Sequence, residues 1–426
     1  MKFTRTTFKN GLNVFLVNVP DAQSVVFTIF VKVGSRYERR GEEGIAHFLE
    51  HVFFKGSQNY PNPSSMSTLI DAIGGDFNAA TSKESTEFYI HAEKHNFDLI
   101  FNVLTDMIQN PLFNAEELQK EKGVVIEEIN LYQDNPGAQV ESNLEEVMWP
   151  KTTLGKEIIG TRASINGLNR DKVFAFKRKF YHPGNIILGI SGAFDQKEVL
   201  KKIRKSWAII KNQAVPKFDL VKEKQSGPRI EIEYRETKQA HLALGFKSYQ
   251  HGHKNNPATM LLASILGGNM SSRLFVNIRE QKGLAYYVRA SNNAYHDTGN
   301  FTIQAGLKIG ETLNAVKSIL AELRKIKTDL VSDAELTRAK DYMKGRIALA
   351  LEDNQEKLNW VLERFAFTGK VKLPEDLFKS LAKVTALDIQ RVANEIFDNN
   401  RMSLALIGPF KNKHEFAKEF YLKGNY

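Results

Sequence analysis

The sequence predicts an α+β fold of two similar halves, each a mainly antiparallel sheet covered by helices. Three observations lead to this prediction. The 426 residues, 42% hydrophobic and 25% charged, have an ordinary globular composition and the length of two or three domains. Helical and strand-like patterns occur in blocks and not in strict alternation. Finally, two segments about half a chain apart share one plan.

The block pattern is clearest in the first 130 residues. Residues 76–92 alternate and are rich in Thr, Phe and Tyr, which predicts two paired strands joined near Lys83 and Glu84. Gly74 and Gly75 end the helical pattern that precedes them. In chain order, the predicted elements are strands at 13–19 and 25–33, helices at 44–54 and 65–73, the paired strands, and helices at 97–108 and 115–130.

The two matching segments are residues 165–194 and 384–410. Each has an Ile/Val-x-x-Leu helix start, an aromatic residue near the helix end, an alternating strand and a Gly-x-Phe end. Leu168 and Leu387 are 219 residues apart, and Gly192 and Gly408 are 216 apart. This repeated spacing favours internal duplication over a chance likeness of two helix–strand units.

A polar stretch lies between the two matching segments. Residues 212–229 contain Pro, Gly and several Lys, a composition typical of a linker. We therefore predict a catalytic, metal-binding half at residues 1–211, the linker at 212–229, and a homologous half without a metal site at 230–426.

The composition excludes several kinds of site. The chain has no cysteine, so it has no disulfide, thiolate nucleophile or iron–sulfur cluster, and any metal must be held by histidine and carboxylate. No apolar run approaches the roughly 20 residues that span a bilayer. Asn10 and Gly11 interrupt the apolar residues near the N-terminus, so no signal-peptide core forms. These features predict a soluble, cytoplasmic protein without a membrane partner.

The chemical signal is the sequence His47-Phe48-Leu49-Glu50-His51 inside a predicted helix. Residues four apart on a helix project from the same face, so both imidazoles can reach one metal ion. Two histidines at this spacing also occur by chance. The glutamate beside them favours a metal site, because this is the inverted form of the H-E-x-x-H zinc helix.

A hydrolytic zinc site needs a third protein ligand, and the segment from Glu121 to Glu128 offers carboxylates for it. Glu121 and Glu128 are two helical turns apart and share a face, whereas Glu127 points about a quarter-turn away. A solvated acidic helix is the plainer interpretation. Three apolar residues between the acids argue against it, because they indicate buried surface.

With these residues, the chain resembles the pitrilysin-type inverzincin peptidases, over nearly its whole length. It is most similar to their short branch, the mitochondrial processing peptidase β subunit and its bacterial relatives. The resemblance implies one zinc ion per chain on His47, His51 and Glu128. It also implies Glu50 as general base and Glu121 as a support of the site.

Two further motifs carry the same resemblance. The segment Gly75-Asp-Phe-Asn78-Ala79 is similar to the family strand that pairs with an extended substrate, which implies that Asn78 and Ala79 contact peptide backbone. The segment around Arg279 and Tyr286, seven residues apart, is similar to the one whose arginine and tyrosine reach the site from the second half. An ordinary edge strand and a surface arginine are the plainer interpretations.

The predicted function is that of a zinc metalloendopeptidase hydrolysing unfolded or extended peptides in a chamber between halves or subunits. The resemblance also implies a homodimer or a heterodimer with a related chain. Two alternatives of the same fold remain: a subunit that needs a different partner chain for activity, and a non-catalytic scaffold. A nucleic-acid binder would use the net charge of +10, but the sequence has no binding motif, so we predict no nucleic-acid partner.

The charge is distributed unevenly along the chain. Residues 1–150 carry 12 basic and 21 acidic residues, a net charge of −9, so residues 151–426 carry +19. Residues 71–150 alone carry 4 basic and 16 acidic residues. Because opposite charges steer association, this distribution predicts a preference for basic peptides. Solvated helix faces are the plainer interpretation.

Overall fold

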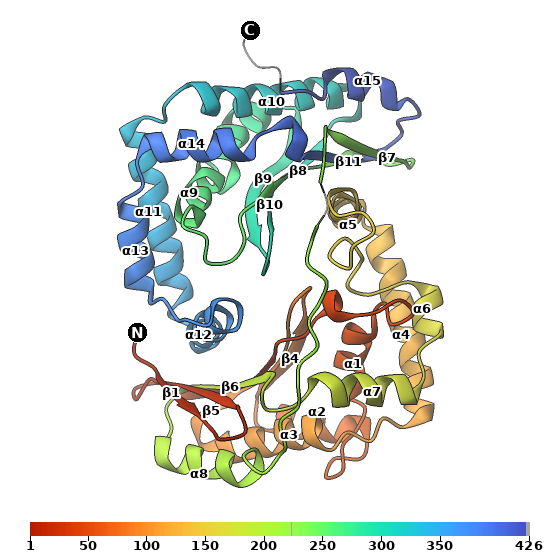
Figure 1. Cartoon of the computed structure of the whole chain (residues 1–426), viewed down its shortest axis with the longest axis vertical. Helices are drawn as coiled ribbons and strands as arrows, with labels where there is room; N and C mark the ends of the chain where they lie inside the picture. Colours follow the sequence, from red (N-terminus) through yellow and green to blue (C-terminus); the bar gives the residue numbers. More distant parts are fainter. Residues whose placement is uncertain (223, 423–426) are drawn as a thin grey trace. The chain divides into compact units, whose positions relative to one another are not determined.

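The computed structural model describes residues 1–222 and 224–422, which form two compact units (Figure 1). The first unit comprises Met1–Asn130, Lys156–Asp219 and Leu349–Lys372, and the second takes up the rest of the described chain. The chain passes between them five times, and one of these passages, after Asp219, falls within residues 212–229. Each unit is built on one sheet.

The sheet of the first unit has six strands in the order β1-β2-β6-β3-β5-β4. All neighbours pair antiparallel except β2 and β6, which are parallel. β4 is therefore an edge strand, paired only with β5. The strands are β1 (Thr4–Thr7), β2 (Asn13–Asn18), β3 (Ser24–Val31), β4 (Asp76–Thr81), β5 (Thr86–Glu93) and β6 (Ile186–Gly192).

Helices cover both faces of this sheet. One face carries the larger core, to which Phe48 and Val52, Ile100 and Leu104, and Val173 and Phe176 contribute from α1, α3 and α7. The opposite face packs against α12 alone of the described helices. The helices are α1 (Ile45–Phe53), α2 (Pro63–Ala72), α3 (Phe97–Gln109), α4 (Ala115–Asp134), α6 (Arg162–Asn166), α7 (Arg170–Phe180), α8 (Gln196–Ser206) and α12 (Asn354–Thr368).

The sheet of the second unit has five strands in the order β7-β11-β8-β10-β9, and again one pair, β7 with β11, is parallel. The strands are β7 (Arg229–Tyr234), β8 (Ala240–Ser248), β9 (Ala285–Ala294), β10 (Gly299–Leu307) and β11 (Met402–Gly408). The helices are α5 (Pro136–Met148), α9 (Asn256–Gly267), α10 (Thr312–Thr328), α11 (Asp333–Ala350), α13 (Pro374–Ala382), α14 (Ala386–Ile396) and α15 (Lys413–Glu419).

Short helical turns complete the described chain. A π-helical turn, η3, spans Phe275–Gln281. The 3₁₀ turns are η1 (Ser35–Tyr37), η2 (Lys94–Asn96), η4 (Ile309–Glu311) and η5 (Asn399–Arg401).

The two sheets share one topology. The order β2-β6-β3-β5-β4 corresponds strand by strand to β7-β11-β8-β10-β9, and the parallel pair falls at the same place in each. The matched sequence segments are α7 with β6 and α14 with β11, and Gly192 and Gly408 end the two strands. The α+β fold of two similar halves is confirmed.

Each unit takes one helix from the sequence of the other half. α5 packs its Val140, Leu144 and Met148 on the second sheet, and α12 packs its Leu358, Val361 and Leu362 on the first. Both helices sit over a glycine: a Cβ at Gly189 would lie 2.8 Å from Leu358 Cδ1, and one at Gly245 would lie 2.6 Å from Met148 Sδ. The predicted linker at residues 212–229 divides the sequence into two halves. The two units divide the chain by packing, and each contains one helix from the other half of the sequence.

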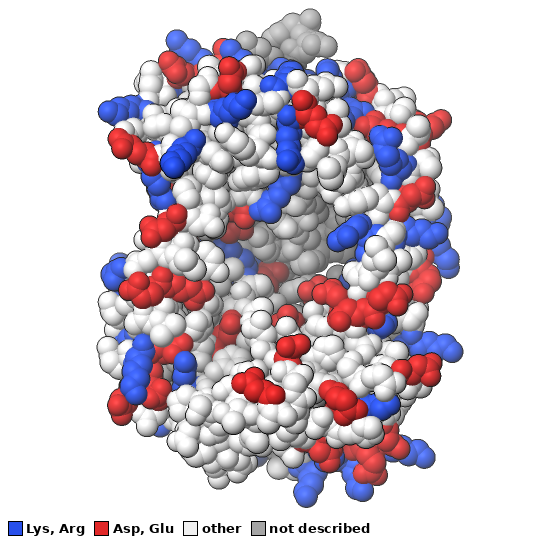
Figure 2. Space-filling model, turned by 180° about the vertical axis from the view of Figure 1, so that it is seen from behind, with Lys and Arg blue, Asp and Glu red and all other residues white. Residues whose placement is uncertain are grey.

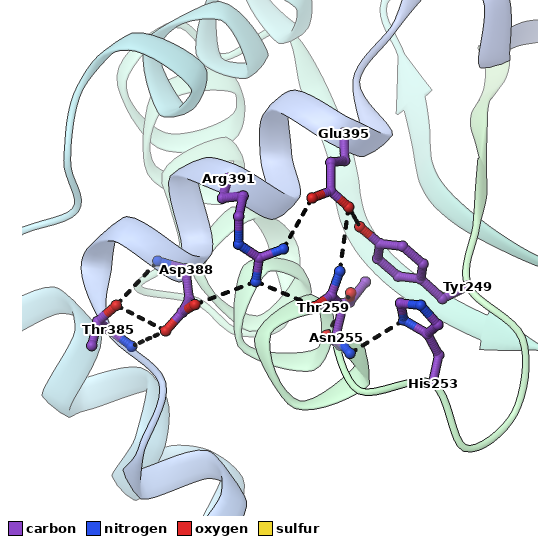
Figure 3. A network of polar contacts seen from close by, with 8 residues as sticks. All are labelled: Tyr249, His253, Asn255, Thr259, Thr385, Asp388, Arg391 and Glu395. Atoms are coloured by element: carbon purple, nitrogen blue, oxygen red, sulfur yellow. Dashed lines mark hydrogen bonds and ion pairs between the residues drawn. The ribbon is translucent and has the colours of Figure 1, made fainter.

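A polar network fixes α14 in the second unit (Figure 3). Arg391 contacts Asp388 at 3.3 Å and Glu395 at 3.0 Å on its own helix, and it donates to Asn255 at the start of α9. Glu395 accepts from Tyr249, whose ring stacks on His253 at 4.2 Å. The loop between β8 and α9 is thereby tied to α14.

No helix within residues 1–222 and 224–422 is both long enough and apolar enough to cross a membrane. On the face drawn in Figure 2, acidic and basic side chains are interspersed over both units.

Candidate metal centre

The helix α1 places three polar side chains on one half-buried face. Its other residues, among them Phe48, Leu49 and Val52, are buried against the sheet. Glu38, itself only 6% exposed, accepts hydrogen bonds from the N–H groups of Gly44 and Ala46 at 2.8 and 2.9 Å. These bonds satisfy the free donors at the start of the helix, as a side-chain cap does. The face that remains carries His47, Glu50 and His51, whose potential ligand atoms lie within 4.8 Å of one another.

The histidines of α1 face a carboxylate of α4. The Nε2 atoms of His47 and His51 lie 3.7 and 3.4 Å from Glu128 Oε2. Zinc bonds of 2.0–2.2 Å in a tetrahedral arrangement place neighbouring ligand atoms about 3.3–3.6 Å apart. These three side chains therefore fit one zinc ion in both donor type and spacing.

Glu121 orients one of the imidazoles. Its Oε1 lies 2.8 Å from His51 Nδ1, and its Oε2 lies 2.7 Å from Lys55 Nζ. The side chain of Glu121 is only 4% exposed, so these two contacts compensate its burial. A hydrogen bond at Nδ1 leaves Nε2 as the metal-facing nitrogen, as is usual for a ligating histidine.

The protonation of the metal-free centre is asymmetric. Burial and the neighbouring His51 lower the pKa of His47 to about 4. Burial also acts to lower the pKa of His51, but hydrogen bonds to Glu121 and Glu128 outweigh it and raise that pKa to about 9. The hydrogen bond with His51 in turn lowers the pKa of Glu128. In the metal-free protein, a protonated His51 therefore lies between Glu121 and Glu128, and its Nε2 proton faces Glu128, where a divalent cation would take its place.

Glu50 stands apart from this ligand set. Its Oε2 accepts a hydrogen bond of 2.5 Å from the hydroxyl of Thr81, the last residue of β4. Burial raises the pKa of Glu50, and the bond from Thr81 opposes that shift. Glu50 and Glu128 could each supply the third ligand by proximity. The geometry favours Glu128, because its carboxylate faces both Nε2 atoms while that of Glu50 is bonded to β4.

The predicted substrate strand is an edge strand. Asn78 and Ala79 lie in the middle of β4, which pairs on one side only, with β5. Asn78 is exposed, and its Oδ1 accepts from the N–H of Ala79 at 2.8 Å. A peptide that uses this N–H would have to replace that bond.

Arg279 and Tyr286 belong to the second unit. Arg279 lies in η3 with its guanidinium 4.7 Å from the centre of the Phe275 ring, and Tyr286 lies on β9 and is 52% exposed. Their roles stay predictions of the resemblance.

Three residues with structural roles at the centre were not found from the sequence. Lys55 follows His51 by four positions and lies in the turn after α1, so its nearness to His51 could have been inferred from spacing. Thr81 and Glu38 carry no such signal, because strand packing and a chain turn bring them to α1.

The comparisons with known proteins cover most of the chain. Residues 13–162 match the family model described as insulinase (peptidase family M16). Residues 167–343 match the model of the peptidase M16 inactive domain. The chain belongs to peptidase family M16. The resemblance drawn from the sequence is thereby confirmed, and the second family model agrees with the absence of a metal set from α9.

Members of the family from several bacteria match this chain from end to end. An uncharacterized zinc protease of Rickettsia felis is 35% identical over 408 residues, which is 96% of this chain and 98% of that one. An uncharacterized zinc protease of Bacillus subtilis is 33% identical over 411 residues, with the same two coverages. The family and these names support a zinc-dependent protease.

Solved structures share the fold. A protease from Helicobacter pylori has a TM-score of 0.91 at 25% identity, covering 96% of this chain and 99% of its own. A Pseudomonas fluorescens structure titled as a peptidase M16 inactive domain has a TM-score of 0.88 at 18% identity, with the same coverages. The latter similarity shows the fold alone.

Proposed function

We propose that this chain is a zinc-dependent endopeptidase that hydrolyses extended peptides. One observation carries the proposal: two imidazoles on α1 and a carboxylate on α4 converge on a single point, and a second carboxylate, Glu50 on α1, is held beside them. The family membership and the names of the relatives support it.

The mechanism divides the work among few groups. Zinc on His47, His51 and Glu128 would supply a Lewis acid that activates water and polarises the scissile carbonyl. Glu50 accepts the proton of the attacking water and donates it to the leaving amine. Burial raises the pKa of Glu50, which suits a group that must hold this proton in passing. β4 offers its free edge to the peptide backbone as an added strand.

The test is incubation of the purified protein with a mixed peptide library, with and without chelator, followed by mass spectrometry. We expect cleavage that stops on chelation and returns with zinc. Glu50→Gln should keep its zinc and lose turnover by about 100-fold to 10,000-fold, the usual share of a general base. Cleavage that persists with chelator, or in Glu50→Gln, contradicts the mechanism.

We further propose that the enzyme prefers peptides with basic side chains. A hollow of about 450 Å³ beside β4 is lined by Asp76, Asp353 and Glu356, together with Asn78, Tyr89 and His91. Burial raises the pKa of the nearby Glu87 to about 7, and the neighbouring carboxylates of Glu363 and Glu356 add to that shift. A cationic side chain of a bound peptide would be attracted to these carboxylates.

Matched peptides test this preference. We expect a higher kcat/KM for Lys- and Arg-containing peptides than for otherwise identical Glu-containing ones at low salt, with a smaller ratio at high salt. Asp76→Asn combined with Glu356→Gln should narrow the ratio. Equal rates for both peptides in the wild-type protein would remove this part of the proposal.

The second candidate function is that of a subunit that is active only together with a different, related chain. In that case the protein would work as a heterodimer and not as a homodimer. The match of residues 167–343 to the model of the peptidase M16 inactive domain supports this candidate. The library assay distinguishes the two candidates: zinc bound by the lone chain without any cleavage favours the subunit.

A further inference from the structure

The hydroxyl of Thr81 links the edge strand to the helix that carries the candidate base. Thr81 ends β4, and its Oγ1 lies 2.5 Å from Glu50 Oε2 on α1. The same face of β4 packs on the end of α1, where the rings of Phe77 and Phe54 lie 5.3 Å apart. The hydrogen bond is therefore made between two elements that are already packed together.

The direction of this hydrogen bond is fixed by its surroundings. Thr86 lies opposite Thr81 in the β4–β5 pair, with the two Oγ1 atoms 3.5 Å apart. The Thr86 hydroxyl donates to the carbonyl of Val33 at 2.8 Å, so its proton is already used. An ionised Glu50 can only accept. The Thr81 proton is therefore directed at Glu50, and Thr81 can in turn accept from Thr86 only if that bond to Val33 is given up.

Thr81 holds the Glu50 carboxylate chiefly through its hydroxyl, with a smaller contribution from its backbone N–H. Within the described part of the chain, no other side chain forms a hydrogen bond with the Glu50 carboxylate. Without the bond, the carboxylate could rotate about its side-chain bonds toward the imidazoles of His47 and His51, whose potential ligand atoms lie within 4.8 Å of its own. Threonine suits the task because its branched side chain has few rotamers in a strand.

We propose that Thr81 is a positioning residue that keeps Glu50 off the metal and ties its orientation to strand β4. A peptide that pairs with β4 would then steady the strand that holds the base. The expected effect on turnover rests on the proposed function. The expected effect on the position of the Glu50 carboxylate does not.

The variants are Thr81→Val, which keeps the branched shape and loses the hydroxyl, and Thr81→Ser, which restores the hydroxyl. With a peptide substrate and zinc, we expect kcat of Thr81→Val to fall about 10-fold to 100-fold with KM and zinc content unchanged, since small misplacements of a catalytic group cost this much. Thr81→Ser should stay within about threefold of the wild type. A Thr81→Val protein with wild-type kcat, or a Thr81→Ser protein as slow as Thr81→Val, would overturn the proposal.

The second unit offers a matched control. Thr302 on β10 pairs with Ser291 on β9, at the strand pair that corresponds to β4 and β5, and their hydroxyl oxygens are 2.8 Å apart. Thr302→Val removes the same group from a cross-strand hydroxyl pair of the corresponding strands, in the middle of the counterpart of β5, without touching Glu50. It should leave kcat unchanged, and an equal loss in both variants would mean that strand pairing and not Glu50 is affected.

Crystal structures of the zinc-loaded proteins test the geometric part without any turnover. We expect the Glu50 carboxylate on Thr81 in the wild type and in Thr81→Ser, and rotated away in Thr81→Val. An unchanged Glu50 in Thr81→Val would refute the inference even in an active enzyme. A wild-type protein that cleaves no peptide would instead refute the proposed function, and the structures would still decide the role of Thr81.

Discussion

The helix that follows the third strand of the first unit and its counterpart in the second differ in what they bury. α1 leaves His47, Glu50 and His51 on a half-buried face, whereas α9 buries almost its whole length, including Leu261, Leu262 and Leu266. Gly267 packs so closely that a Cβ there would lie 2.4 Å from the backbone nitrogen of Ala290. An imidazole has no room at this end of α9.

The helix α4, which carries Glu121 and Glu128, differs from its counterpart α11 in the same way. Counted from the start of each helix, Glu121 and Glu128 of α4 correspond to Ala339 and Arg346 of α11. An alanine cannot orient an imidazole, and an arginine repels a cation. One fold thus carries a candidate metal-ligand set in one unit, with apolar or basic residues at the corresponding positions of the other, so the fold alone does not create the site.

Removal of the third ligand should break this difference most strongly. Glu128→Ala leaves two imidazoles for zinc, so we expect bound zinc to fall from one per chain to none after dialysis, and cleavage to be lost. Elemental analysis measures the zinc. Arg346→Ala, at the corresponding position of α11, should keep one zinc. Full zinc occupancy in Glu128→Ala would identify another third ligand.

Loss of the supporting carboxylate should have a smaller effect. Glu121→Gln weakens the hold on His51 Nδ1 and leaves Lys55 without its ion pair, so zinc affinity should fall about 10-fold to 100-fold, the usual cost of such a change. Competition with a fluorescent chelator measures it. An affinity equal to that of the wild type would mean that Glu121 does not support the metal.

The pH dependence of zinc affinity sharpens the role of His51. Because its pKa is raised to about 9, zinc must displace a proton at pH 7, and the apparent affinity should rise about tenfold per pH unit until pH 9. The stability of the metal-free protein should change with pH in the opposite direction. Protonated His51 contributes stability that is complete below its ordinary pKa of 6.5 and lost as the pH rises through 9. A pH-independent zinc affinity would contradict this protonation.

Substitution of the glycines beneath α5 and α12 should have the smallest effect, a loss of folding stability. Gly189→Ala would press a methyl group on Leu358 and Leu362, and Gly245→Ala would press one on Met148 and Leu144, so each should lower the free energy of unfolding by about 1–3 kcal/mol. The flexible Met148 should make the second change the milder one. Denaturant titration measures both. Gly345→Ala, in open space on α11, should be neutral or stabilising.

Much of this organisation could be predicted from the sequence, because it depends on local periodicity and on repetition. The helix at 44–54 and the strands within 76–92 are confirmed as α1, β4 and β5, with their join at Lys83 and Glu84. The spacing of Glu121 and Glu128 placed both on one face of α4, where they now meet His51.

The remainder depends on contacts between distant parts of the chain. The periodicity of α5 and α12 gives each an apolar face, but it does not reveal which sheet that face covers. The bond from Thr81 to Glu50 likewise requires the strand to lie beside the helix.

The most direct test is the crystal structure of the zinc-loaded wild-type protein, with anomalous diffraction at the zinc edge. We expect a single zinc ion bonded to the Nε2 atoms of His47 and His51 and to Glu128, with Glu50 hydrogen-bonded to Thr81 and outside bonding distance of the zinc. A zinc ion bonded to Glu50 in place of Glu128, or bound elsewhere, would contradict it.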